Sequence, residues 1–281
     1  MTRLKTVFYE SFALNRPSVA RIAEIAADTS QKVNFERLRE QTNLGNNYIK
    51  SMPRYAVGAG LLEDRTNRLT PLGKTVLAHD PDLNHPATLW LMHYHLSAPK
   101  GPGPAFWHYF VTQILYPGER LERSRLLELL GTFLSENSIE LSEASIGRTV
   151  TVFTGTYTKS DALGKLGVFA KNDYDDDAGG VKVGEPKVLT VGEPNPPPTF
   201  ALGYALAHFW EQEVNALRTN LSSLSASGGF SSIFFLGSYA LNSALRDLQR
   251  EGFVELEQVS PPHHLVRRWE HKEAFLERLY D

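Results

Sequence analysis

Residues 43–64, NLGNNYIKSMPRYAVGAGLLED, decide how the first part of this chain folds. After Gly45, apolar side chains recur at three- and four-residue spacing, which is the pattern of a helix with one buried face. The packed side of this helix consists of Tyr48, Ile49, Met52 and Tyr55. Its other side carries small polar and cationic residues, all with hydrogen-bond donors. These outward residues are Asn46, Asn47, Lys50 and Arg54.

The segments on both sides of this helix extend the pattern. Residues 17–27, PSVARIAEIAA, and 34–44, NFERLREQTNL, each predict a helix, the first opened by proline and the second capped by Asn34. Residues 61–73, LLEDRTNRLTPLG, form two short apolar pieces around a polar turn, which is typical of a small hairpin. The order helix, helix, turn, helix, hairpin predicts a winged helix-turn-helix over residues 1–80.

The exposed donors of the third helix predict contact with DNA. In a winged helix-turn-helix this helix lies in the major groove, so its outward side chains must reach base edges and phosphates. The side chains expected to contact DNA are Asn46, Asn47, Lys50 and Arg54 in the helix, with Arg65 and Arg68 in the wing. Pro53 either bends this helix or ends it near Met52. Winged helices also dock proteins, so that alternative stays open.

Composition and charge favour a folded protein with one basic end. The chain has 281 residues, 42% of them hydrophobic, and a formal charge of −3. Residues 1–75 carry 12 Lys and Arg against 7 Asp and Glu, whereas residues 161–200 carry 4 against 7. A basic module followed by a more acidic remainder is typical of a nucleic-acid contact made by one end. Scattered solvated charge is the alternative.

The sequence contains no cysteine. Disulfides, thiolate nucleophiles, iron–sulfur clusters and cysteine-type zinc sites are therefore excluded, and any sulfur chemistry must belong to another protein. No apolar run approaches the roughly 20 residues that cross a bilayer, and the start of the sequence has no signal-peptide pattern. We therefore expect a cytoplasmic protein without a membrane partner.

The rest of the chain repeats this succession of helices and hairpins without a strict sequence repeat. Residues 121–157 predict two helices, and the second presents Arg148 outward as a further DNA contact. A polar hairpin over residues 170–192 follows them. Residues 227–256 predict a third unit, with a helix from Ser238 to Glu251 that Gly252 ends.

These patterns together predict the fold class. We expect a mainly α protein with small β-hairpins (α+β), built from tandem winged helix-turn-helix-like units. A proline-rich connector, GEPNPPPTF at residues 192–200, separates the last two units. The predicted domains are residues 1–80, 81–192 and 193–281.

Residues 88–96, TLWLMHYHL, are apolar on nearly all sides and predict a buried helix. His93 and His95 point about 200° apart on a helix, so they cannot bind one metal ion together. We interpret both as hydrogen-bonded structural histidines. The aromatic residues of 106–110, FWHYF, are expected to pack against Trp90 and Tyr94.

An acidic stretch in the polar hairpin has the pattern of a metal-dependent nuclease site. Asp177 and Glu185 could hold Mg²⁺ or Mn²⁺, and Lys187 could steady the attacking or leaving group. The alternative is a solvated loop tip, because short acidic turns beside Gly-Gly are usually loops. The LGKTVL stretch at residues 72–77 lacks the first glycine and the strand of a phosphate-binding loop.

Residues 261–271, PPHHLVRRWEH, contain a cationic cluster near the end of the chain. The cluster consists of His263, His264, Arg267 and Arg268. Such a cluster could bind phosphate. It could equally be a surface segment before the last helix, so both interpretations stay open.

Four stretches of the sequence resemble, in the same order, the bacterial DUF4007 family. They are NLGNNYIKSMPRYAVGAGLLED (43–64), LTPLGKTVLAHDPDLNHPATLWLMHYHLSA (69–98), FWHYF (106–110) and IGRTVTVFTGTYTKSDALGKLGVF (146–169). The likeness covers residues 43 to 170, and the ordered set is specific.

The resemblance implies a role in DNA phosphorothioation, in which sulfur replaces a non-bridging phosphate oxygen on one DNA strand. One group of the family, the B component of the Ssp system, is regarded as a DNA nicking protein that works beside a cysteine desulfurase, an ATPase and a sulfur-inserting enzyme. We therefore expect a DNA-binding component of a phage-defence system that nicks one strand of double-stranded DNA. The alternatives are a non-catalytic DNA-reading subunit and a scaffold that binds the other components.

Overall fold

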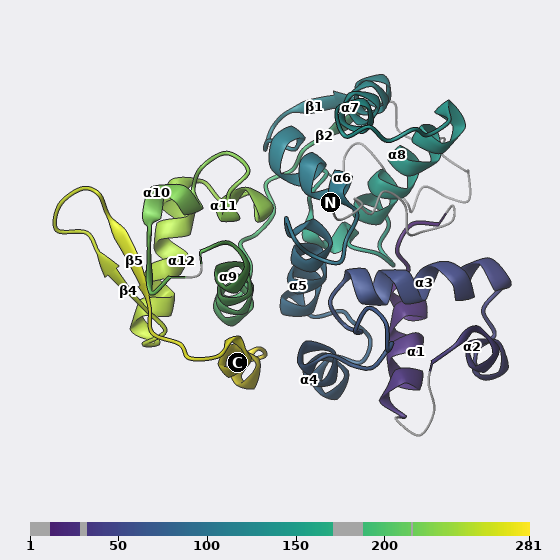
Figure 1. The fold of residues 1–281 in the computed structure, drawn as a ribbon, viewed down its shortest axis with the longest axis horizontal. Helices are drawn as coiled ribbons and strands as arrows, with labels where there is room; N and C mark the ends of the chain where they lie inside the picture. The colour runs from purple at the N-terminus through teal and green to yellow at the C-terminus, as the bar shows by residue number, and fades with distance from the viewer. Residues whose placement is uncertain (1–11, 29–32, 171–187, 215) are drawn as a thin grey trace.

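The structure is a computed structural model that describes residues 12–28, 33–170, 188–214 and 216–281. These residues form a mainly α-helical fold with small antiparallel β-sheets, which confirms the predicted fold class (Figure 1). The α-helices are α1 (Arg16–Ala27), α2 (Phe35–Gln41), α3 (Asn46–Gly58), α4 (Pro71–His79), α5 (Pro86–Ser97), α6 (Ala105–Tyr109), α7 (Arg123–Glu136), α8 (Glu143–Thr158), α9 (Thr199–Glu213), α10 (Leu221–Leu224), α11 (Phe230–Ile233) and α12 (Ser238–Arg250). Shorter helical segments are η1 (Phe110–Ile114), η2 (Gly164–Leu166) and η4 (Lys272–Arg278), and the strands are β1 (Arg120–Glu122), β2 (Val188–Thr190), β3 (Arg218–Asn220), β4 (Val254–Glu257) and β5 (His264–Arg267).

The first helices begin at side-chain caps that the sequence provides. Asn15 accepts a hydrogen bond from the Ser18 backbone N–H at the start of α1 (3.0 Å), and Asn34 caps α2 in the same way. Such caps satisfy N–H groups that have no partner inside the helix. After α3, a short antiparallel bridge joins Leu62 and Leu69 before α4 begins. The predicted order of elements is therefore observed, and the winged-helix assignment itself stays a prediction.

α3 continues through its internal proline. The helix extends to Gly58, so the alternative in which it ends near Met52 is wrong. Proline inside a helix removes one backbone donor, and its ring clashes with the carbonyl of the preceding turn. Met52 and Tyr55, however, are fully buried on the packed side of this helix. We infer that packing of this buried face holds the helix together across Pro53. Arg54 consequently belongs to the same helix as Lys50.

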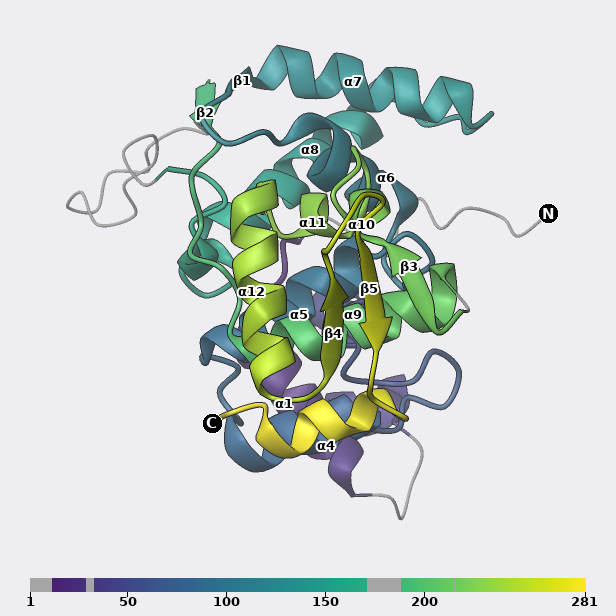
Figure 2. The same ribbon diagram turned by 90° about the vertical axis from the view of Figure 1, so that its left-hand side faces the viewer.

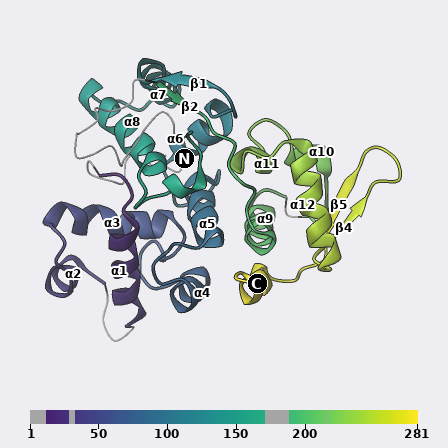
Figure 3. The same cartoon turned by 180° about the vertical axis from the view of Figure 1, so that it is seen from behind.

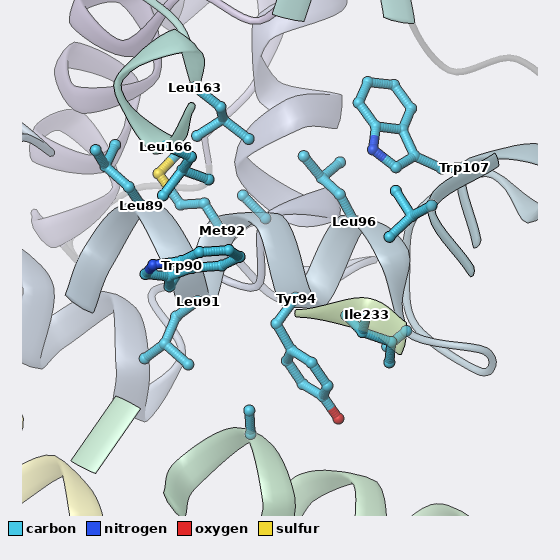
Figure 4. Close-up of a cluster of buried hydrophobic side chains, with 14 of the residues drawn as sticks. Leu89, Trp90, Leu91, Met92, Tyr94, Leu96, Trp107, Leu163, Leu166 and Ile233 are labelled. Carbon is cyan, nitrogen blue, oxygen red and sulfur yellow. The ribbon is translucent and has the colours of Figure 1, made fainter. Parts of the chain in front are cut away.

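α5 lies at the centre of the molecule. Every residue from 87 to 97 is buried, as the apolar sequence predicted. Figure 4 shows side chains leaving α5 in several directions, with Leu163 and Leu166 on one side and Ile233 on another. Buried side chains from residue 14 to residue 279 join one continuous cluster around this helix. The predicted division at residues 80 and 192 stays a prediction.

The aromatic residues after α5 pack differently from the expectation. The Trp107 ring lies 5.0 Å from the ring of Phe153 in α8, measured between centroids. Trp90 and Tyr94 instead pack against Phe234, at 5.7 and 5.9 Å. The expected pairing is therefore corrected, because Trp90 and Tyr94 leave α5 on the side that faces the residues following α11.

A buried hydrogen-bond chain runs through α5. Trp107 Nε1 donates to Tyr157 Oη (2.8 Å), which lies 2.8 Å from His93 Nδ1. His93 Nε2 lies 2.6 Å from the carbonyl oxygen of Ile233. Since a carbonyl can only accept, Nε2 carries the ring proton and Nδ1 accepts the Tyr157 proton. The prediction that His93 is a hydrogen-bonded structural residue is confirmed.

His95 differs from this expectation. It is buried, yet its Nε2 atom has no hydrogen-bond partner among the residues that the structure describes. Its ring lies 4.9 Å from the ring of His208 in α9 and 5.2 Å from that of Tyr94, between centroids. The predicted hydrogen bonding is therefore wrong for His95 Nε2, and the ring acts as a packing group between α5 and α9.

The buried histidine in α5 makes the stability of the protein depend on pH. Burial lowers the pKa of His93 from 6.5 to about 4. Below pH 6.5 the unfolded chain takes up a proton at this residue, whereas the folded protein does so only near pH 4. The contribution of His93 to stability is therefore fully present above pH 6.5 and decreases as the pH falls, by about 2 kcal/mol at pH 5. Burial also lowers the pKa of His208, which adds to the total loss. Urea unfolding at pH 7 and pH 5 measures this loss. In His93→Gln the loss should shrink by about that amount, and an unchanged pH dependence would contradict this role.

Both sheets pair strands that are distant in sequence. β1 pairs antiparallel with β2, with Leu121 opposite Leu189, although 65 residues lie between the end of β1 at Glu122 and the start of β2 at Val188. Next to β2, Phe169 and Val191 form a bridge, so the two described arms of the predicted polar hairpin do lie side by side. The second sheet has the order β3–β5–β4. Figure 2 shows β4 and β5 beside α12, with η4 below them.

Candidate nucleic-acid interface

One face of α3 presents the polar residues predicted from the sequence. Asn46, Asn47, Lys50 and Arg54 are exposed, while the apolar side, including Ile49, is buried. Residues three, four and seven positions apart lie on one side of a helix, so Asn47, Lys50 and Arg54 share a face. The helix contains no Asp or Glu. This face therefore offers hydrogen-bond donors and positive charge without an acidic residue of its own helix.

The start of α3 is also suited to an anion. Its cap is Gly45, which has no side chain to bind the first N–H groups. Such groups, together with the positive end of the helix dipole, are a favourable environment for a phosphate. Asn46 and Asn47 stand in this first turn and add amide donors. Both ends of the polar face can consequently contact a polyanion.

A pocket of about 550 Å³ opens beside the polar face. Lys50 and Arg54 line it from α3, and Asp64 and Asn67 line it from the hairpin turn. The rest of its lining is mostly apolar: Val33, Phe35, Leu38, Ile49, Pro53, Val57 and Pro102, with Asn34. The pocket shows that α3 and the hairpin turn form one concave surface, with cationic side chains at the helix side.

The hairpin turn holds the two arginines predicted for the wing. Arg65 and Arg68 are exposed. The turn is closed by the Glu63 backbone N–H, which donates to the carbonyl oxygen of Arg68 (2.8 Å). Asn67 takes a left-handed conformation (φ 53°), which Asn tolerates better than most residues, and donates to the carbonyl oxygen of Val33 (3.2 Å). The turn is thereby attached to the segment before α2.

Arg148 lies on a different helix from the other predicted DNA contacts. It is exposed on α8, and its guanidinium donates to Ser145 Oγ (3.0 Å). A second pocket, of about 330 Å³, is lined by Thr151 and Gly155 of α8 and by Tyr48 of α3. Since Arg148 is three and seven residues before Thr151 and Gly155, it belongs to the same side of α8. The structure thus brings this side of α8 next to α3.

The predicted catalytic and metal residues all belong to the polar segment between Ala170 and Val188. Asp177, Glu185 and Lys187 lie outside the described residues. Elsewhere, in the part of the chain that the structure describes, no three His, Asp or Glu side chains come together as a metal site. The described residues therefore offer no alternative set of metal ligands, and the nuclease pattern rests on the sequence alone.

Two polar residues of the interface were not singled out by sequence reasoning. Asn67 lines the pocket from the hairpin turn, and Asn34 lines it from the segment before α2. The sequence identified Asn34 only as a helix cap, and nothing local indicates that residues this far apart meet. The turn propensity of Asn67 was the one available signal.

The class of protein follows from this architecture. The chain is a mainly α-helical protein with small β-sheets, and its described helices are too short or too polar to span a bilayer. Its sequence matches the family model described as "Protein of unknown function (DUF4007)" over residues 19–178, which is more than half of the chain. The chain belongs to the DUF4007 family, as the resemblance predicted. A comparison with curated proteins gave no match.

Two solved structures share the fold. One is described as "SspB crystal structure" and the other as "Magnesium ion-bound SspB crystal structure". Each aligns with a TM-score of 0.74 and covers 99% of this chain and 87% of the other, at 17% and 18% sequence identity respectively. At this identity the likeness establishes a common fold over nearly the whole chain.

Proposed function

We propose that this protein is the DNA-contacting component of a DNA phosphorothioation system and that it binds double-stranded DNA with the exposed face of α3. The observation that carries this proposal is the donor-rich face itself, exposed and without an acidic residue in its helix. The SspB-like fold and the DUF4007 family support the phosphorothioation context. The excess of basic residues in the first 75 positions favours the same end of the chain.

Each group of the interface has a physical role in this proposal. The amides of Asn46 and Asn47 can pair with base edges, as Asn does with adenine in the major groove. Lys50 and Arg54 supply charge for phosphates or guanine. Arg65 and Arg68 on the hairpin turn, and Arg148 on α8, are proposed to contact the phosphate backbone. A predominantly phosphate-directed surface makes the affinity strongly dependent on salt.

The proposed partners come from the family resemblance, and the absence of cysteine agrees with them. This chain has no thiol to carry sulfur, so the sulfur that replaces a phosphate oxygen must be delivered by other proteins. We propose a cysteine desulfurase, an ATPase and a sulfur-inserting enzyme as these partners, within a phage-defence system. This chain would supply the DNA contact.

Nicking of one DNA strand is proposed as a second activity. A solved structure with the same fold is described as magnesium ion-bound, which favours a divalent metal in relatives of this chain. Asp177 and Glu185 are the proposed ligands for Mg²⁺ or Mn²⁺, with Lys187 beside them, and all three lie outside the described residues. The rivals are a non-catalytic DNA-reading subunit and a scaffold for the other components.

Removing one cation from the α3 face tests the DNA contact. Lys50→Ala is expected to weaken binding to a duplex roughly tenfold, because a phosphate contact is lost, and to lower the salt slope of the binding constant by about one unit. Fluorescence anisotropy with a labelled duplex, repeated at several salt concentrations, measures both quantities.

Lys165→Ala is the matched control for this experiment. Lys165 is an exposed lysine of η2, outside α3 and its hairpin turn, and its amino group donates to Asn84 Oδ1 (2.9 Å). This variant should bind with the affinity and salt slope of the parent protein. Equal behaviour of the Lys50 and Lys165 variants would overturn the assignment of α3 as the DNA-contacting helix.

A further inference from the structure

The C-terminal unit arranges its elements in an order known from DNA-binding domains. α9 is followed by β3, then by α10, α11 and α12, and then by the β4–β5 hairpin. β3 joins this hairpin on the β5 side, antiparallel to it. A winged helix has this order, with the helix before the hairpin in the DNA-reading position and the hairpin loop as its wing. α12 and loop 258–263 occupy these two positions.

α12 has a buried side and an opposite exposed side. Leu241, Leu245 and Leu248 are buried against the rest of the unit. Tyr239, Ser243 and Arg246 are exposed, and their spacing of four and three residues places them on one side of the helix. We refer to these three residues as the α12 stripe. Tyr239 is 88% exposed although it is a large aromatic residue, so it packs against nothing that would explain its position.

The charge of the α12 stripe differs from that of its surroundings. Residues 193–281 contain 7 Lys and Arg against 11 Asp and Glu, yet the stripe has no carboxylate. Arg246 forms no ion pair with any residue that the structure describes. The arginines that do bind carboxylates in this unit are Arg218, Arg250, Arg268 and Arg278. An arginine without an ion pair, one helical turn from a serine hydroxyl and two turns from a tyrosine, is complementary to a polyanion.

The hairpin loop is attached to the same helix. Gln258 Nε2 donates to Asn242 Oδ1 (3.1 Å), and the Leu256 backbone N–H donates to Gln249 Oε1 (2.7 Å). Loop 258–263 contains no acidic residue, and Val259 in it is fully exposed. These bonds hold the hairpin against α12 beside the stripe. Neither the stripe nor the loop contains a carboxylate of its own, and the nearest carboxylates in sequence are Asp247 and Glu257.

We propose that the α12 stripe and loop 258–263 form a second surface for double-stranded DNA, with Arg246 on a phosphate and Tyr239 and Ser243 at the edge of the groove. This inference rests on the proposed function, in which α3 is the first DNA surface. The β4–β5 hairpin lies at the end of the molecule away from α2 and α3 (Figures 1 and 3). The two surfaces can therefore hold separate segments of duplex.

Counting the duplexes bound by one chain tests this inference. A labelled duplex of about 12 base pairs, roughly one helical turn, is titrated at low salt into the full-length protein, and the stoichiometry is read from the break in fluorescence anisotropy. The parent protein should bind two duplexes per chain. Arg246→Glu combined with Tyr239→Ala should bind one. The matched control, Arg125→Glu combined with Tyr116→Ala, changes an arginine and a tyrosine that are also exposed and should still bind two.

The same titration separates this inference from the proposed function. Lys50→Glu should leave the α12 duplex bound, and adding Arg246→Ala should weaken that remaining binding about tenfold and lower its salt slope by about one unit. If the parent binds one duplex per chain, and this binding is lost in Lys50→Glu but retained in the α12 variant, the second surface is overturned. The α3 proposal then stands, and the α12 stripe would be assigned to a protein partner. One duplex lost in the α12 variant and insensitive to Lys50→Glu would overturn the α3 proposal instead.

Discussion

Supercoiled plasmid incubated with this protein and Mg²⁺ or Mn²⁺ is expected to become open-circular, and EDTA is expected to stop the conversion. A divalent metal activates water and stabilises the leaving oxygen of a phosphodiester, and the proposed ligands are Asp177 and Glu185. Asp177→Asn should therefore lower the nicking rate roughly 100- to 1000-fold, which corresponds to about 3–4 kcal/mol of activation free energy. Agarose gels of the same samples, run for topology and for retardation, measure nicking and binding together.

Asp173→Asn is the matched control for the nicking experiment. It removes a carboxylate from the same acidic stretch but not one of the proposed ligands, so its rate should equal that of the parent protein. The Asp177 variant should still retard the plasmid, because the DNA contact is assigned to α3. Retardation without metal-dependent open circles would make the chain a non-catalytic DNA-reading subunit. The absence of both retardation and nicking would favour the remaining alternative, a scaffold that binds the other components of the system.

The polar face of α3 could be predicted because its signals are local. The spacing of Ile49, Met52 and Tyr55 defines the buried side, and every residue that the pattern placed outside is exposed. The end of the helix could not be decided from sequence, since the cost of Pro53 had to be compared with tertiary packing that only the structure shows. The free energy gained by burying this side of the helix exceeds the cost of Pro53.

Features that depend on distant residues were not predictable in the same way. β1 pairs with β2 although α7 and α8 lie between them in the sequence. A strand of three residues is too short to show a recognisable alternation of apolar and polar residues. His95 was expected to be hydrogen-bonded because buried polar groups usually are, but its neighbours are aromatic rings from α5 and α9. The α12 stripe shows regular spacing in the sequence, yet its meaning depends on which arginines are neutralised by carboxylates elsewhere.

Replacing Gly60 by Ala is expected to destabilise the fold by about 2–5 kcal/mol. Gly60 follows α3 in the left-handed region (φ 76°), where a side chain costs roughly 1–2 kcal/mol. A Cβ there would lie 2.4 Å from Cδ2 of His95, and overpacking of a buried site adds roughly 1–3 kcal/mol. The rings of Tyr94 and His208 pack against the His95 ring and restrict its movement away from Gly60. Urea unfolding of the two proteins at pH 7 measures the difference.

Gly131→Ala shows whether such a loss is specific to this position. Gly131 lies inside α7 with open space where a Cβ would be, so alanine there should stabilise the protein by roughly 0.5–1 kcal/mol.

The carbonyl oxygen of Gly60 also accepts a hydrogen bond from Thr70 Oγ1 (2.6 Å), beyond the hairpin turn. The contact at Gly60 therefore fixes α3 and the hairpin against α5 at one point. A loss below about 1 kcal/mol in Gly60→Ala would mean that α3 can shift away from α5 at little cost. The DNA-facing helix would then be positioned by its own unit rather than by the central core.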